Sequence, residues 1–279
     1  MRIGFIGAGK VGFTLGKYFT SKGVNVVGYY SQHIDDAREA AAFTQTNYFK
    51  DAETLIAACD TLFLTVPDTN IVEVWNEIKH YPISGKNICH CSGALSADIL
   101  TDLQYCGAHG YSVHPIYAIH DKYTSFQTFS EAYFTVEGCD AHISQITMLI
   151  ASLGNSVRIM KAENKALYHA ASVMVSNLVI ALAKTGSDLF SQCGFDAQFS
   201  EKAWNALFLG NAENICHSGV SKALTGPLER GDINTIRQHL DCLSDKQREI
   251  YVTLSRILLS VAQEKHPDRD YSLIETELK

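Results

Sequence analysis

The sequence predicts an α/β domain with a doubly wound parallel sheet, followed by an all-α domain. Strand-like and helix-like segments alternate through residues 1–160, as in a parallel sheet with helices on both faces. After Met160 no strand pattern recurs, and only helical periodicity remains. We therefore expect a nucleotide-binding domain over residues 1–160 and a helical domain over residues 161–279.

The individual elements follow from apolar runs, their periodicity and the turn residues between them. Short apolar runs predict strands at Ile3–Ile6, Val24–Tyr30, Thr61–Val66, Asn87–Cys91, Gly110–His114, Ala132–Glu137 and Ser156–Met160. Apolar residues three or four apart predict the first domain's helices at Phe13–Thr20, Asp35–Phe43, Ala52–Ala58, Ile71–Tyr81, Ala97–Leu103 and Ala141–Leu153. The later helices are expected at Ala162–Gln192, Ser200–Gly219, Asp232–Leu240 and Lys246–Gln263, with a loosely held polar tail from Pro267.

A glycine-rich motif lies between the first strand and the first helix. It reads Gly7-Ala8-Gly9-Lys10-Val11-Gly12, and this context is what makes a G-x-G-x-x-G pattern informative. Gly7 permits a tight turn, Gly9 lets the backbone approach a pyrophosphate, and Gly12 lets helix and strand pack closely. The phosphates would sit at the helix N-terminus, where unpaired N–H groups favour anions. The motif therefore predicts a dinucleotide-binding Rossmann domain.

The end of the second strand indicates which dinucleotide binds. An acidic residue there accepts a hydrogen bond from the ribose 2′-hydroxyl of NAD and repels a 2′-phosphate. This chain has Ser31, Gln32 and His33 instead, and its first acids come later, at Asp35 and Asp36. The three side chains can donate to a phosphate, so NADP is favoured over NAD, although the arginine that binds phosphate best is missing.

A second loop is expected to face the cofactor. Val66-Pro67 ends the third predicted strand, and ligands of parallel sheets bind at the carboxyl ends of the strands.

A polar stripe on the long helix after residue 160 suggests catalysis. Lys165, His169, Ser172 and Ser176 follow spacings of four, three and four, which puts them on one side of an otherwise apolar helix. The stripe is expected to face the cleft between the domains, where Lys165 or His169 would donate a proton as hydride arrives. The alternative is that Lys165 lies in an exposed first turn and His169 is a core histidine.

Composition excludes several classes of function. The net charge of −7 disfavours nucleic acid and anionic membranes as partners, and no apolar run is expected to be long enough to span a bilayer. The eight cysteines form no C-x-x-C pair and we expect no targeting segment, so a cytoplasmic protein with reduced thiols is predicted. Cys89-His90-Cys91 lacks the usual zinc spacing, and we expect no metal.

The chain resembles a superfamily that joins a Rossmann domain to a helical domain like that of 6-phosphogluconate dehydrogenase. Its members include β-hydroxyacid dehydrogenases, ketopantoate reductase and pyrroline-5-carboxylate reductase. The resemblance is greatest to Rossmann-like NADP oxidoreductases with a C-terminal domain of unknown function. It rests on residues 7–12, Val66-Pro67-Asp68, residues 90–95, Ser112-Val113-His114-Pro115, Tyr168-His169-Ala170-Ala171 and residues 225–232.

The resemblance implies roles for individual residues. Ser92 and Gly93 match a loop that in relatives lies beside nicotinamide and substrate, and Lys165 matches the acid/base lysine of β-hydroxyacid dehydrogenases. Those enzymes have an asparagine four residues later, where this chain has His169. This departure argues against the hydroxyacids that those enzymes use.

Further residues are expected around the substrate. His114 follows a strand, and either a place in the cleft or a place in the core fits it. Arg230 would hold a carboxylate, unless its segment is only a surface turn, and Ser172 would complete the substrate site. Relatives commonly form dimers through the helical domain, which we expect here.

Two functions fit these observations. The first is an NADP-dependent reductase of a small carbonyl or imine acid, with hydride transfer in the interdomain cleft. The second is a non-catalytic NADP-binding protein with a regulatory or interaction role, because a fold does not determine chemistry.

Overall fold

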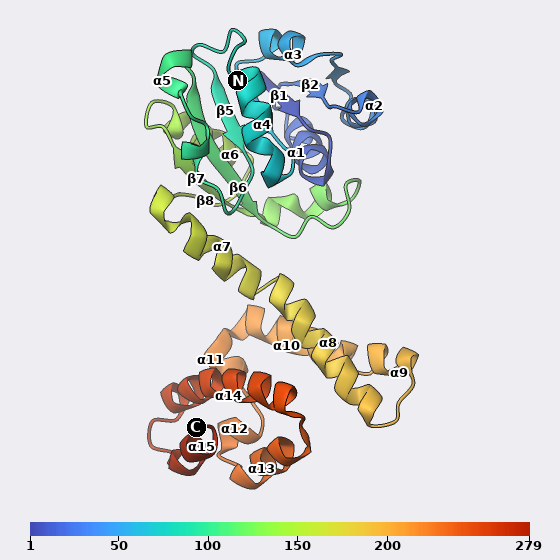
Figure 1. Cartoon of the computed structure of the whole chain (residues 1–279), viewed down its shortest axis with the longest axis vertical. Coiled ribbons are helices and arrows are strands. Elements are labelled where there is room, and N and C mark those ends of the chain that lie inside the picture. Colours follow the sequence, from blue (N-terminus) through green and yellow to red (C-terminus); the bar gives the residue numbers. More distant parts are fainter. The chain divides into compact units, whose positions relative to one another are not determined.

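A computed structural model describes residues 1–279. Eight strands form one sheet in the order β3-β2-β1-β4-β5-β6-β7-β8 (Figure 1). Their bounds are β1 Ile3–Ile6, β2 Val26–Tyr30, β3 Asn47–Tyr48, β4 Thr61–Leu64, β5 Asn87–His90, β6 His109–Ile116, β7 Tyr133–Gly138 and β8 Val157–Ile159. The chain is helical from residue 162 onward. The predicted α/β domain followed by an all-α region is therefore confirmed.

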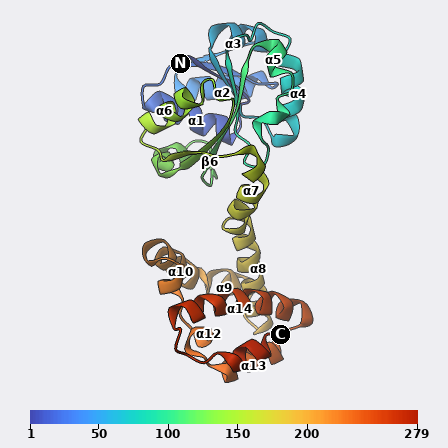
Figure 2. The same ribbon diagram turned by 90° about the vertical axis from the view of Figure 1, so that its left-hand side faces the viewer.

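The helices of the α/β region cover both faces of its sheet (Figure 2). They are α1 Lys10–Ser21, α2 Ile34–Thr44, α3 Ala52–Ala58, α4 Asp68–Ile78, α5 Leu103–Cys106 and α6 Ile143–Ser152, with 3-10 turns η1 Ala97–Ile99 and η2 Ser125–Glu131. The later ones are η3 Ala162–Asn164, α7 Lys165–Met174, α8 Asn177–Gln192, α9 Ala197–Lys202, α10 Asn205–Ser218, α11 Val220–Ala223, α12 Pro227–Arg230, α13 Ile233–Cys242, α14 Asp245–Lys265 and α15 Ser272–Glu277.

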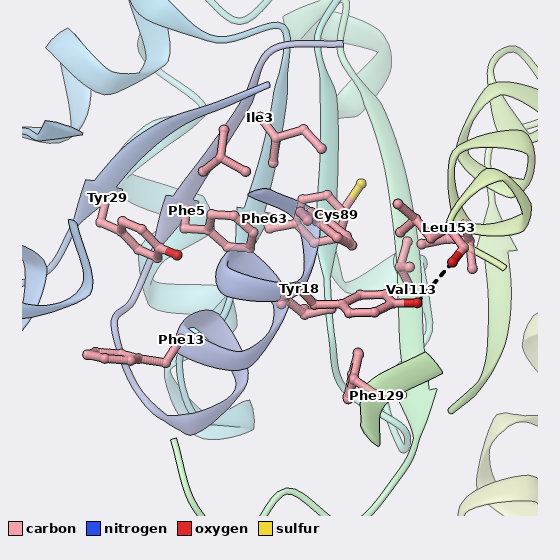
Figure 3. Packing of buried hydrophobic residues seen from close by; sticks show 14 of the residues in the cluster. Ile3, Phe5, Phe13, Tyr18, Tyr29, Phe63, Cys89, Val113, Phe129 and Leu153 are labelled. Carbon is pink, nitrogen blue, oxygen red and sulfur yellow. Dashed lines mark hydrogen bonds between the residues drawn. The ribbon is translucent and has the colours of Figure 1, made fainter. Parts of the chain in front are cut away.

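The sheet separates two apolar cores because successive side chains of a strand point to opposite faces. In β1, Ile3 and Phe5 pack with α1 and α6, whereas Ile6 packs with α3 and α4. The first core is rich in aromatic rings, with Phe5 stacked on Tyr29 at 5.2 Å between centroids (Figure 3). A buried polar group in it is paired: the Tyr18 hydroxyl donates to the Leu153 carbonyl at 3.0 Å.

The chain divides into two compact units, residues 1–177 and residues 178–279. The sheet and α7 belong to the first unit. The second has its own core, formed by α12, α13, α14 and α15. The expected domain boundary near residue 160 coincides with the end of the sheet, whereas the division into units follows α7. The reason is that the first turns of α7 pack on the sheet through Lys165 and Tyr168.

The expectation of an entirely parallel sheet is wrong at one strand. β7 runs antiparallel to β6, while the other neighbours are parallel. A parallel pair needs a crossover connection, usually through a helix. The connection between β6 and β7 contains only the 3-10 turn η2, so the chain returns alongside β6.

Two helix predictions and the prediction for the tail also need correction. The helix expected at Ala97–Leu103 is replaced by η1 and the short α5, because Ser96 caps η1 and Asp102 adopts a left-handed conformation. The helix expected at Ala162–Gln192 contains a turn at Val175-Ser176, between α7 and α8. The tail is held rather than loose, because Tyr271, Ile274 and Leu278 are buried in the core of the second unit.

One further expectation is wrong. The stretch Ala162–Gln192 is long and apolar enough, by length and composition, to cross a membrane. Its many small and hydroxyl side chains interrupt the apolar residues, so a search for an unbroken apolar run does not find the stretch. Such a stretch is weak evidence of a membrane span, because core helices of soluble proteins have the same composition.

We expect Ile274→Ala to destabilise the second unit by about 2–5 kcal/mol, because removing a buried isoleucine leaves a cavity. Ile274 is 1% exposed, whereas the adjacent Leu273 is 62% exposed and serves as the matched control. Denaturant unfolding of the full chain measures both variants. Equal effects of the Ile274→Ala and Leu273→Ala changes would contradict the docking of α15.

Candidate functional site

The glycines of the loop between β1 and α1 are required for different steric reasons. Gly7 has a φ of 101°, and a Cβ there would lie 2.8 Å from the Thr65 carbonyl. A Cβ on Gly12 would lie 2.5 Å from the Gly7 oxygen and 2.6 Å from Thr65 Oγ1, so no side chain fits between α1 and the strands. A Cβ on Gly9 would meet nothing within 4 Å. The open space beside Gly9 is what the approach of a pyrophosphate requires.

A cavity of about 700 Å³ opens at this loop, within the usual range for small-molecule sites. It collects most of the residues predicted to bind the cofactor: Gly7, Ala8, Gly9, Lys10, Ser31, Gln32, His33, Val66 and Pro67 all line it. Gly9 is the residue before α1, so the unpaired N–H groups of the helix N-terminus belong to its wall. Val11, Gly12, Ser92 and Gly93 do not line it.

Residues that sequence reasoning missed also line this cavity. Asp36, Asn70, Glu73 and Glu77 come from α2 and α4, and Lys122 comes from the loop after β6. The position of Asn70 just after Val66-Pro67 is a signal that could have found it. Nothing in the local sequence marks Lys122, because only the tertiary fold brings it to the cavity.

A polar cluster in the same unit surrounds Lys165, which is 2% exposed. Lys165 Nζ donates to the Ser92 carbonyl oxygen at 2.9 Å and to Ser112 Oγ at 2.6 Å. Ser112 Oγ donates to the same carbonyl at 3.1 Å. Burial lowers the pKa of the Lys165 ammonium, and the carboxylates of Glu137 and Asp68 partly offset this. An exposed first turn, one of the two expectations for Lys165, is therefore wrong.

Ser92 connects this cluster with the loop that lines the cofactor cavity. Its hydroxyl donates to Asp68 at 2.6 Å and accepts from the backbone N–H groups of Ala94 and Leu95. Asp68 directly follows Pro67, which lines the cavity. The turn after β5 is thus held from one side by Asp68 and from the other by Lys165.

His114 is oriented by a chain of hydrogen bonds from β7 and α7. Thr135 Oγ1 donates to the Tyr168 hydroxyl at 3.2 Å, and that hydroxyl lies 2.5 Å from His114 Nδ1. The Tyr168 hydroxyl has one proton, and it can donate this proton to Nδ1 while it accepts from Thr135. The neutral imidazole of His114 then has its proton on Nε2. Sequence reasoning assigned no role to Tyr168, which it named only as part of the motif Tyr168-His169-Ala170-Ala171.

Gly93 separates two imidazoles that face the same small space. A Cβ on Gly93 would lie 2.8 Å from His114 Nε2 and 2.9 Å from His169 Nδ1. His169 Nδ1 is buried and has no hydrogen-bond partner within the chain. Predicted residues Lys165, His169, His114, Ser92 and Gly93 are therefore brought together at the carboxyl ends of β5 and β6, the edge where parallel sheets bind ligands.

Two other predicted substrate residues lie apart from these contacts. The Ser172 hydroxyl donates to the Tyr168 carbonyl one turn earlier at 3.1 Å, within its own helix. Arg230 ends α12 in the second unit, where the neighbouring Glu229 carboxylate accepts from His266.

Burial keeps two histidines near Lys165, His114 and His90, neutral. It lowers the pKa of His114 to about 4, and the Lys165 ammonium adds to the shift. Burial likewise lowers the pKa of His90 to about 4. His90 accepts from the Ser92 N–H through Nδ1 at 3.3 Å, and its Nε2 lies 3.2 Å from the Ser96 carbonyl. A neutral His90 that donates through Nε2 satisfies both contacts.

Comparison with known families agrees with this fold. Residues 2–91 match the family described as NADP oxidoreductase, coenzyme F420-dependent, and residues 132–257 match a domain of unknown function, DUF2520. The family resemblance predicted from the sequence is confirmed: an NADP oxidoreductase segment precedes a DUF2520 segment. The comparisons thus support an oxidoreductase that uses NADP. No curated protein matches it.

Solved structures share the fold over nearly the whole chain. A Thermotoga maritima protein is 24% identical, with 94% of this chain and 99% of that chain covered and a TM-score of 0.73. A provisionally named NADP oxidoreductase of Bacteroides fragilis is 22% identical, with 93% and 98% covered and a TM-score of 0.70. A Plasmodium falciparum pyrroline carboxylate reductase with NADP bound is 16% identical, with 98% of both chains covered and a TM-score of 0.61.

The histidine pKa values predict an acid-sensitive fold. Below pH 6.5 the unfolded chain protonates His90 while the folded protein does not, so stability falls from pH 6.5 to about 4. The shift corresponds to about 3 kcal/mol. We expect His90→Gln to flatten the pH dependence of the unfolding free energy, whereas the exposed His80→Gln leaves it unchanged. Identical pH profiles for His90→Gln and the wild type would contradict the neutral, buried imidazole.

Proposed function

We propose that the protein is an NADPH-dependent reductase of a small carbonyl or imine compound that carries a carboxylate. The observation that carries the proposal is the cluster of Lys165, His114 and His169 at the edge of the sheet, joined to the cofactor cavity through Ser92 and Asp68. A hydride donor and a proton donor side by side are what the reduction of such a double bond requires.

The residues around the cavity fit NADPH. The helix N-terminus after Gly9 and the open space there suit the pyrophosphate, and Ser31, Gln32 and His33 supply donors near the ribose. When bound, the cofactor would supply the hydride. The remaining work of the protein is to orient the substrate, exclude water and deliver a proton.

Lys165 is the proton donor in this proposal. Its ammonium has three N–H groups, of which two are used by Ser92 and Ser112, and its lowered pKa makes it a better acid. The neutral His114 would donate a hydrogen bond from Nε2 to the substrate. His169 Nδ1, which has no partner, would contact the substrate on the other side of Gly93.

The substrate class rests on chemistry and on one neighbour. Pyrroline carboxylate, named in the Plasmodium structure, is a cyclic imine with a carboxylate, and its reduction needs the same pair of donors. Ser172 would contact the substrate from α7, and Arg230 is our candidate for the carboxylate.

A non-catalytic NADP-binding protein with a regulatory or interaction role is the second candidate. It is favoured by His169, which stands where the resembled dehydrogenases have asparagine. The two candidates differ in turnover and agree in nucleotide binding, so binding and turnover must be measured separately.

We expect Lys165→Ala and His169→Ala to lower kcat by about 10²–10⁴-fold, the usual contribution of a general acid. The dissociation constant for NADPH should stay unchanged, because neither residue lines the cofactor cavity. NADPH fluorescence measures binding, and its loss on adding small oxo acids or cyclic imine acids measures turnover. Ser176→Ala, on the same helix, is the control.

Unaltered turnover in both variants would refute the assigned roles. A wild-type protein that binds NADPH and reduces none of these substrates would instead favour the non-catalytic candidate.

We also propose a cytoplasmic homodimer formed through the helical region. Large apolar side chains are exposed on three helices: Leu167 on α7, Ile180 and Leu182 on α8, and Leu207 and Leu209 on α10. Such exposed patches mark interfaces with a protein or a membrane. The Lys184–Asp188 ion pair within the apolar stretch disfavours a bilayer, where charges are costly, so a second copy is the better occupant.

The wild type should therefore have a mass of twice 30.8 kDa in light scattering after size-exclusion chromatography. Ile180→Glu should shift it toward the monomer, because a charge is buried at the interface. Tyr105→Glu, at an exposed aromatic residue on α5, should not. A monomeric wild type, or one recovered only with detergent, would refute the dimer.

A further inference from the structure

The loop after β6 contributes a cation to the cavity at the glycine loop. Lys122 lies between β6 and η2, and it lines the same cavity as Lys10, Ser31, Gln32 and His33. The expectation from the sequence was that neutral donors at the end of β2 would bind a 2′-phosphate without a cationic partner. Lys122 supplies a positive charge at this cavity, whereas Ser31 and Gln32, which follow β2, are uncharged.

The position of Lys122 is fixed by contacts with the first two helices. Its Nζ lies 2.7 Å from Glu39 Oε1 on α2 and 4.6 Å from the centre of the Phe13 ring on α1. The adjacent Tyr123 hydroxyl donates to the same Glu39 oxygen. The Tyr123 ring packs edge-on against Phe13 and Phe43, with centroids 5.7 and 5.4 Å away. The loop is therefore anchored on the side of the cavity formed by α1 and α2.

The ammonium keeps the capacity to bind an anion. Of its three N–H groups one is used by Glu39, and the side chain is 32% exposed. Hydrogen bonds from Lys122 and Tyr123 lower the pKa of Glu39, so this carboxylate is ionised and holds the lysine in place. A phosphate monoester carries nearly two negative charges at neutral pH, whereas a carboxylate carries one. A phosphate therefore attracts the Lys122 ammonium more strongly than Glu39 does.

We propose that Lys122 binds the 2′-phosphate of NADP and is the cation that distinguishes NADP from NAD. The inference rests on the proposed function, because it requires the nucleotide in this cavity. A competing arrangement is present on the same wall: Asp36 also lines the cavity and would accept from a free 2′-hydroxyl, which would favour NAD. The relative affinities for the two nucleotides decide between these residues.

The experiment is a fluorescence titration of the full chain with NADPH and with NADH. We expect the wild type to prefer NADPH. Lys122→Met retains the aliphatic stem and should weaken NADPH binding by about tenfold or more, the usual value of a hydrogen bond to a charged group. It should leave NADH binding unchanged. Lys122→Arg should retain the preference, because arginine also binds phosphate.

Controls separate this role from a structural one. Lys161→Met removes an exposed lysine elsewhere in the same unit and should change neither affinity. Thermal unfolding of each variant reports whether the loop still folds. Free 2′-phosphoadenosine nucleotides should compete with NADPH on the wild type, and they should compete more weakly on Lys122→Met.

Several results would overturn the inference. An equal loss for NADPH and NADH in Lys122→Met would assign the lysine to the pyrophosphate or to the loop. No loss for either would remove it from the site, and a wild type that prefers NADH would assign selectivity to Asp36. A wild type that binds neither nucleotide would contradict the proposed function itself, and the inference with it.

Discussion

The buried ammonium of Lys165 is the interaction on which the polar site depends. Removing a charge from water is costly unless it is paired or hydrogen-bonded. Here the charge is met by the Ser92 carbonyl, from the turn after β5, and by the Ser112 hydroxyl of β6. These bonds attach the first turn of α7 to the edge of the sheet. Tyr168, one turn later, is thereby placed against His114.

Burial, reinforced by the same charge, lowers the pKa of the neighbouring His114 and His90. Burial lowers the pKa of His114, and the nearby Lys165 ammonium lowers it further because it disfavours a second cation. His114 therefore stays neutral. A neutral imidazole donates through one nitrogen only, and the Tyr168 contact selects which. One buried lysine and one tyrosine thus convert a histidine into a directed hydrogen-bond donor.

The sequence was sufficient for features that depend on local physics. The glycine loop, the alternation of strands and helices over residues 1–160 and the stripe from Lys165 to Ser176 follow from backbone sterics and periodicity. The fold confirms the position of the loop between β1 and α1 and the alternation. The sequence was insufficient where distant segments meet. Lys122 reaches the cavity through a loop far along the chain, and β7 is reversed because its connection lacks a crossover helix. The tail from Pro267 looks polar, yet three spaced apolar residues hold it.

Asp68 connects the cavity at the glycine loop with the polar cluster around Lys165. Asp68 is the first residue of α4 and directly follows Val66 and Pro67, which line the cavity. The Asp68 backbone therefore lies next to the cavity wall. Its carboxylate accepts from Ser92, whose carbonyl is the acceptor for Lys165. The start of α4 after Pro67, the turn after β5 and α7 therefore share a single chain of hydrogen bonds. Asp68 and Ser92 thus connect the cavity wall to Lys165 through two short hydrogen bonds, of 2.6 and 2.9 Å.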